Sequence, residues 1–121
     1  MMKNSEKAVE LHKSFHSCSE SVLCAFADDA GLTESQASAA AKPFAGGRMT
    51  KCGAVLAAQY VLAKKFGEDS NKLSQFEEKF IALNKSAVCR ELKGALTGAP
   101  LRSCRGCVSD SAEILEKLLS E

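Results

Sequence analysis

The segment 46–67 contains the most apolar run of this chain, placed directly after a pair of glycines and a cysteine. Its sequence is GGRMTKCGAVLAAQYVLAKKFG, and between Ala54 and Ala63 only Gln59 and the hydroxyl group of Tyr60 interrupt the apolar side chains. A helix of this composition has no polar face, so it must be surrounded by protein on nearly every side. The run is also well short of the roughly 20 residues that cross a bilayer. The segment therefore predicts a central, buried helix and no membrane insertion.

The composition favours helix along the rest of the chain as well. Ala, Leu, Lys and Glu dominate, β-branched residues are scarce and Trp is absent, which are the preferences of helices rather than strands. A chain of 121 residues has the usual size of one domain, and no repeat or linker divides it. We expect a single all-α domain over residues 1–121, a compact bundle of five to six helices around the central one.

The charge pattern makes several classes of partner unexpected. The formal net charge is +1, with Lys and Arg interleaved with Asp and Glu, so the chain lacks the basic footprint of a nucleic-acid-binding protein. The segment 46–53 lacks the Gly-Lys-Ser/Thr ending of a phosphate loop, and the sequence shows no recognisable Ser/His/Asp catalytic arrangement. Neither a nucleotide enzyme nor a hydrolase is expected. Residues 1–15 carry charges instead of the apolar run of a signal peptide, which indicates a cytoplasmic protein.

Helical periodicity and stop signals predict the other elements. Amphipathic spacing marks helices over 5–16 and 71–85, and the second has an apolar stripe. That stripe consists of Leu73, Phe76, Phe80 and Leu83. A helix from Cys18 to a stop at Gly31 either follows a break at His16 and Ser17 or continues the first helix.

Local signals place the remaining boundaries. Thr33 and Gln36 match a capping box, and Pro43 bends or ends the helix that this box begins. Gly67 closes the central helix. A short turn over 89–94 is followed by a loop over 94–103 and a last amphipathic helix, for which Ser103 and Asp110 are the candidate N-caps.

Four of the six cysteines fall at or beside a predicted helix start. They are Cys18, Cys52, Cys89 and Cys104. The unpaired amides and the dipole of a helix N-terminus favour the thiolate, which is both a nucleophile and a metal ligand. Cysteine is also among the most buried residue types and often packs as a small apolar side chain. The shared placement therefore points to thiol or metal chemistry, with simple packing as the alternative.

The other cysteines and the two histidines carry weaker signals. Cys104 and Cys107 form the only C-x-x-C pair, a spacing that serves disulfide exchange or metal binding. Cys24 lies on a different helical face from the preceding cysteine and is expected in the core. His12 and His16 are one turn apart and could share a metal-binding face. Their polar neighbours favour solvent exposure instead.

Cys52, Gly53 and Ala54, followed by an apolar helix, give the chain its family resemblance. It resembles the redox-active protein family with the C_GCAxxG_C_C pattern of four cysteines, in which a CGAxxG motif marks the second. The other matching positions are Cys18, the segment Phe44–Gly47, Cys89 with Arg90, Glu91 and Leu92, and Cys104. The final glycine of the motif is Ala57 here, which is expected to loosen a helix contact without removing the site.

The resemblance implies redox activity. A similar domain in a dihaem cytochrome is associated with an iron-sulfur centre, so the resemblance also implies cluster binding. The C-x-x-C-H signature of covalent haem is absent, because Val108 follows Cys107.

These inferences lead to one working hypothesis. The four cysteines converge, with three backbone glycines beside them, to bind a metal or an iron-sulfur cluster or to cycle between thiol and disulfide. The glycines are Gly46, Gly47 and Gly53. Cys52 would be the central thiolate, and Cys107 a resolving or substitute thiol. The alternatives are a helical scaffold with packed cysteines and a structural zinc protein. No sequence motif identifies the redox partner protein, an enzymatic activity or the formation of a homo-oligomer.

Overall fold

The computed structural model describes residues 4–14, 16–47, 51–92, 94, 98, 101 and 103–120, except for the side chains of 45–47, 89, 90 and 104. The helices are α1 (Asn4–Lys13), α2 (Cys18–Ala25), α3 (Glu34–Ala41), the 3-10 helix η1 (Lys42–Gly47), α4 (Gly53–Phe66), α5 (Asn71–Asn84), the single turn α6 (Cys89–Leu92) and α7 (Cys104–Ser120). Strand-like pairing in these residues is limited to one antiparallel bridge between Lys51 and Val88. The predicted all-α class is confirmed.

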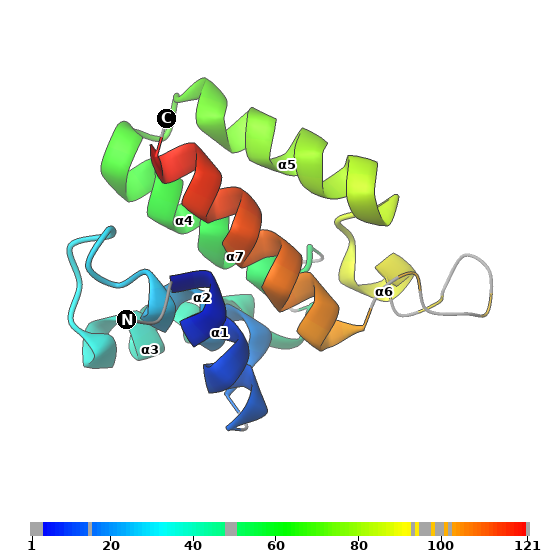
Figure 1. Ribbon diagram of the computed structural model, residues 1–121, viewed down its shortest axis with the longest axis horizontal. Helices are drawn as coiled ribbons and strands as arrows, with labels where there is room; N and C mark the ends of the chain where they lie inside the picture. The colour runs from blue at the N-terminus through cyan, green and yellow to red at the C-terminus, as the bar shows by residue number, and fades with distance from the viewer. Residues whose placement is uncertain are drawn as a thin grey trace.

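Helices α4 and α7 run in the same general direction across the molecule, and both begin on the side where α6 lies (Figure 1). Helix α5 packs against both of them and runs the opposite way. Helices α1 and α2 pack against each other and against α7, and α2 also contacts α4. This arrangement brings the starts of several cysteine-bearing helices to one region of the bundle. No helix in the described part of the chain combines the length and apolar character needed to span a membrane.

Helix α4 is the predicted central helix. Its fully or nearly fully buried residues are Gly53, Ala54, Val55, Ala57, Ala58, Val61 and Leu62. Gly67 ends it with φ +102° and a main-chain bond to Ala63 O of 2.9 Å, because a glycine adopts this conformation without strain. Phe66 is 38% exposed. Its position in the last turn, after Lys64 and Lys65, lies beyond the buried part of the helix.

Helix α5 buries the predicted stripe except at its last position. Phe76 and Phe80 are fully buried, with ring centroids 6.4 Å apart in a stacked arrangement. The stripe continues at Asn84, which is 4% exposed, whereas Leu83 is 64% exposed. Steps of four residues keep one side of a helix facing the core, so the polar Asn84 takes the place that hydrophobicity assigned to Leu83. Asn84 Nδ2 donates to Phe80 O at 3.4 Å.

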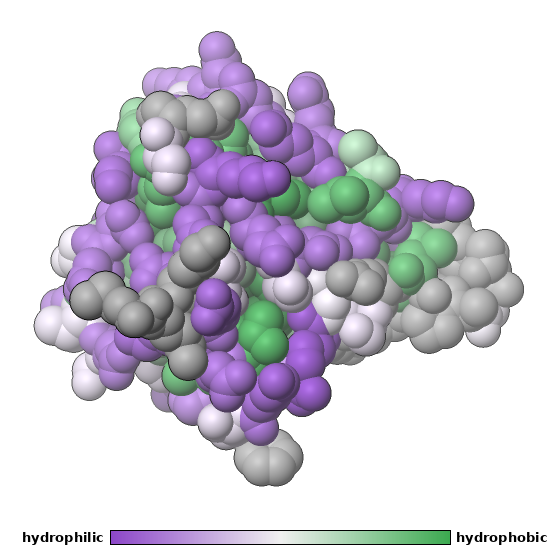
Figure 2. Space-filling model, viewed as in Figure 1, coloured by the Kyte–Doolittle hydropathy of each residue, from purple (hydrophilic) through white to green (hydrophobic). Residues whose placement is uncertain are grey.

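The molecular surface carries few large apolar side chains in its described part. Those that are exposed are Phe66, Ile81 and Leu83. Figure 2 shows a mainly hydrophilic face with separate apolar areas, one of them toward the C-terminal end of α5.

Local signals set the helix boundaries in the first half of the chain. The Ser17 side chain accepts a hydrogen bond from Glu20 N at 3.2 Å, so α2 starts separately from α1 and the break is real. Helix α2 ends at Ala25, earlier than predicted, and Gly31 with φ +72° belongs to the turns that follow it. The capping box at Thr33 is present, as predicted.

Candidate functional site

Cys18 is the first residue of α2 and is half-buried. Its sulfur lies 3.7 Å from Nε2 of His12, which comes from the last turn of α1. The next residue, Ser19, is fully buried and donates from its hydroxyl group to Ala41 O at 2.9 Å. The start of α2 is therefore fixed against the end of α3, and its cysteine faces the end of α1.

Cys52 is the N-cap residue of α4 and is 5% exposed. Its side chain makes no capping hydrogen bond, while its main-chain N–H donates to Ala87 O at 2.7 Å. Lys51 forms the antiparallel bridge with Val88. Cys52 is thus held beside the two residues that lead into α6.

Gly53 allows α4 to approach α2 closely. A Cβ atom added here would lie 2.9 Å from Phe44 O and 3.3 Å from Ser19 Cβ, which is closer than side chains normally come to one another. The Phe44 ring meets the ring of Tyr60 with centroids 5.8 Å apart. Protein atoms therefore occupy the space beside Gly53, and its contact with a cofactor stays a prediction. Gly46 and Gly47 fall within η1, but their surroundings lie outside the described part.

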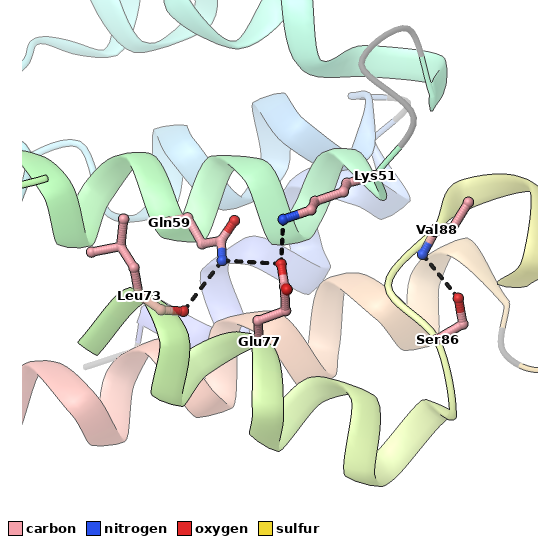
Figure 3. Close-up of polar contacts among 6 residues, drawn as sticks. All are labelled: Lys51, Gln59, Leu73, Glu77, Ser86 and Val88. Atoms are coloured by element: carbon pink, nitrogen blue, oxygen red, sulfur yellow. Dashed lines mark hydrogen bonds and ion pairs between the residues drawn. The ribbon is translucent and has the colours of Figure 1, made fainter. Parts of the chain in front are cut away.

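The approach to α6 is organised by Ser86. Its hydroxyl group accepts from Val88 N at 3.0 Å and donates to Glu91 Oε1 at 2.6 Å. Val88 N and the Ser86 hydroxyl are drawn in Figure 3. The acidic residue of the Cys-Arg-Glu-Leu segment thus holds the turn that presents Cys89, whose own side chain is among those not described.

The start of α7 carries the C-x-x-C pair. Of the two predicted N-caps, Ser103 and Asp110, the structure has Ser103, whose hydroxyl group accepts a hydrogen bond from Gly106 N at 3.0 Å. Cys107 is 2% exposed and one turn inside the helix. The side chain of Cys104 lies outside the description. Leu101, just before α7, donates from its main-chain N to Leu92 O at 2.9 Å, which joins this start to α6.

His12 connects the starts of α2 and α7. Nε of Arg105 donates to Nδ1 of His12 at 3.4 Å, while the other ring nitrogen faces the Cys18 sulfur. Burial, and to a lesser extent the charge of Arg105, lowers the pKa of His12 from its ordinary value. His12, expected in solvent, is half-buried, because its ring lies between Arg105 of α7 and Cys18 of α2. His16 instead places Nδ1 2.9 Å from Leu11 O, so the two rings serve separate contacts.

Taken together, these contacts run through the four helix starts that bear the predicted site cysteines. The start of α2 touches that of α4 at Gly53, and Cys52 is bonded to the approach to α6. The end of α6 is hydrogen-bonded to the residue just before α7. Arg105 of α7 contacts His12, and His12 contacts Cys18 at the start of α2.

Cys24 lies apart from these contacts, in the core, as predicted. It is 7% exposed, and its sulfur is 3.8 Å from Glu34 O. Burial raises the pKa of the Cys24 thiol, and the carboxylates of Glu20 and Glu34 raise it further against the opposing charge of Lys7. A thiol that stays protonated is a poor nucleophile and a poor metal ligand.

A polar group on α5 supports the residue before Cys52. Lys51 Nζ pairs with Glu77 Oε1, and Nε2 of Gln59 lies 3.5 Å from the same oxygen and 3.2 Å from Leu73 O (Figure 3). Glu77 is half-buried, although its neighbours Glu78 and Lys79 are exposed. Its side chain is only 31% exposed, because the opposite charge of Lys51 and the amide of Gln59 draw it against α4.

The metal-binding prediction has no geometric support from the described side chains. Among them, no group of three or more His, Cys, Asp and Glu residues is placed to hold a metal ion. Two of the four predicted ligands, Cys89 and Cys104, have side chains outside that set. The four-cysteine ligand set therefore stays a prediction.

Comparison with known proteins gives one finding. Neither the curated proteins nor the solved structures yielded a match. A sequence model of the family described as "Putative redox-active protein (C_GCAxxG_C_C)" matches residues 16–118, which span all six cysteines. The chain therefore belongs to the C_GCAxxG_C_C family of redox-active proteins.

Proposed function

We propose that this protein is a thiol-disulfide redox protein that exchanges electrons with a partner protein through its helix-start cysteines. The observation that carries the proposal is the set of contacts that links the starts of α2, α4, α6 and α7, each of which bears one of Cys18, Cys52, Cys89 and Cys104. Membership of a family of redox-active proteins supports the same chemistry.

The proposed reaction is a dithiol-disulfide exchange. A thiolate of this protein attacks one sulfur of a partner disulfide, the partner's sulfur-sulfur bond breaks, and the leaving thiolate takes a proton from water. A second cysteine of this protein then attacks the mixed disulfide. The partner leaves as a dithiol, and this protein, having lost two electrons and two protons, keeps the new disulfide.

Burial suggests how the cysteines divide these steps. Cys52 and Cys107 are 5% and 2% exposed, so a protein partner cannot reach their sulfurs directly. Such thiols suit the second, intramolecular step. Cys18 is half-buried and suits the first.

The test is a count of thiols after purification without air. The protein is oxidised with excess glutathione disulfide, alkylated in denaturant and weighed by mass spectrometry, and iron and zinc are measured on the same sample. We expect two thiols to disappear on oxidation and to return with a dithiol reductant. Replacement of Cys18 with Ser should abolish this change, whereas Cys24→Ala, the matched control in the core, should preserve it.

Two results would contradict the proposal. One is a count of six alkylated thiols both before and after oxidation. The other is one equivalent of iron or zinc that protects the cysteines from alkylation until a chelator removes it, which would establish the metal site in place of thiol exchange.

A further inference from the structure

The His12 ring has both of its nitrogens engaged, one on each side. Nδ1 lies 3.4 Å from Nε of Arg105, and Nε2 lies 3.7 Å from the sulfur of Cys18. The three side chains come from α7, α1 and α2. His12 precedes the segment that the family model matches, so its part in the site is additional to the four-cysteine pattern.

The Arg105 contact determines which ring nitrogen carries the hydrogen. A guanidinium nitrogen donates and cannot accept, so Nδ1 of His12 must present its lone pair to Arg105. The neutral ring then carries its hydrogen on Nε2. Nε2–H points to the Cys18 sulfur, which is therefore the acceptor.

This arrangement differs from a cysteine paired with a general base. A base must direct an unshared lone pair at the thiol to take its proton, and Nε2 of His12 already holds a hydrogen. The ring can instead stabilise a sulfur that has lost its proton, because a hydrogen bond to the charged form favours that form. The first turn of α2 adds its dipole in the same direction, since Cys18 is its first residue.

We propose that Cys18 is the attacking thiol and that His12 is its positioning residue, donating a hydrogen bond from Nε2 to the sulfur in a tautomer fixed by Arg105. This deepens the function proposed above and rests on it for the reaction. Cys18 is also the one cysteine among those with described side chains that is not buried.

Two carboxylates on the same two helices form other contacts. Glu20 of α2 bonds to the Ser38 hydroxyl group, and Glu10 of α1 pairs with Lys13 at 3.6 Å.

The first measurement is the rate at which iodoacetamide alkylates Cys18, followed by peptide mass spectrometry in the full-length chain. Replacing His12 with Leu removes the donor, and we expect the rate at pH 7 to fall about tenfold, which corresponds to about one pKa unit in the thiol. The rate should recover at high pH, where the thiol ionises without help. His12→Gln keeps an N–H donor at the distal position and should stay within about threefold of wild type. His16→Gln is the matched control and should change nothing.

The second measurement reads the tautomer directly. Nitrogen-15 NMR of the histidine rings at pH 7 should show His12 protonated at Nε2 and bare at Nδ1, and Arg105→Ala should release this preference. This readout needs no His12 variant, so it holds even if His12→Leu does not fold.

The proposal is overturned if folded His12→Leu alkylates Cys18 with the wild-type pH profile, or if His12 carries its hydrogen on Nδ1. Both measurements are made on the reduced protein without a partner. A protein that cycles two thiols but fails these tests refutes the role of His12 alone. One that passes them but forms no disulfide refutes the proposed function.

Discussion

The contact between α2 and α4 at Gly53 predicts that Gly53→Ala destabilises the fold, although alanine is the better helix former. The new Cβ would meet the main-chain oxygen of Phe44 at 2.9 Å and Ser19 Cβ at 3.3 Å. Neither atom is at the end of a flexible side chain, so backbone must move, and overpacking of this kind costs about 1–3 kcal/mol. The gain in helix propensity is smaller than the ~1 kcal/mol of a helix interior, because Gly53 is the first residue of α4. The expected net loss is about 1–2 kcal/mol of unfolding free energy.

Urea unfolding followed by circular dichroism measures this loss. With a slope of about 2 kcal/mol/M, the midpoint should fall by about 0.5–1 M. Ser74→Ala, on the exposed side of α5, controls for a generic effect of alanine in a helix and should stay within about 0.5 kcal/mol. A midpoint for Gly53→Ala that equals or exceeds the wild-type value would refute the close approach of α4 to α2.

Three further predictions follow from the core and from the support of α4. Phe80→Ala should cost about 3–5 kcal/mol and Leu83→Ala less than about 0.5, and similar midpoints in urea for the two variants would contradict the observed stripe on α5. Because the folded-state pKa of Cys24 lies above its unfolded value, the stability of wild type relative to Cys24→Ala should decline as pH rises above about 8.5. A difference that stays constant from pH 7 to 10 in urea unfolding would argue against this. Single and double alanine variants of Lys51 and Glu77 should give a coupling energy of about 0.5–1 kcal/mol that shrinks in 1 M salt. Strict additivity of the two single-variant effects on the unfolding free energy would show that this ion pair does not stabilise α4.

The parts of the fold that were predictable depend on neighbours in sequence. The capping box at Thr33 and Gln36 lies within three residues, and the stop at Gly67 is a property of one residue. The burial of α4 follows from its lack of a polar face.

The parts that were not predictable depend on which elements meet. Leu83 and Asn84 are both compatible with an amphipathic helix, and only the position of α5 against the bundle selects Asn84. The contact of His12 with Arg105 joins residues 93 positions apart, a separation that no local pattern reports. The only sequence signal for the contact between His12 and Cys18 was a histidine six residues before a helix-start cysteine. That signal is weak, because it does not include Arg105.

The anchoring of Cys52 bears on the entropy of any bond that its sulfur forms. Its main-chain N–H is bonded to Ala87, the residue before it is paired with α5, and Gly53 after it is pressed against α2. Ordering the backbone of a residue costs about 1–2 kcal/mol, and here folding has already met that cost. A disulfide at Cys52 would restrict only side-chain torsions, so its redox potential should depend on sulfur geometry and charge and little on chain order.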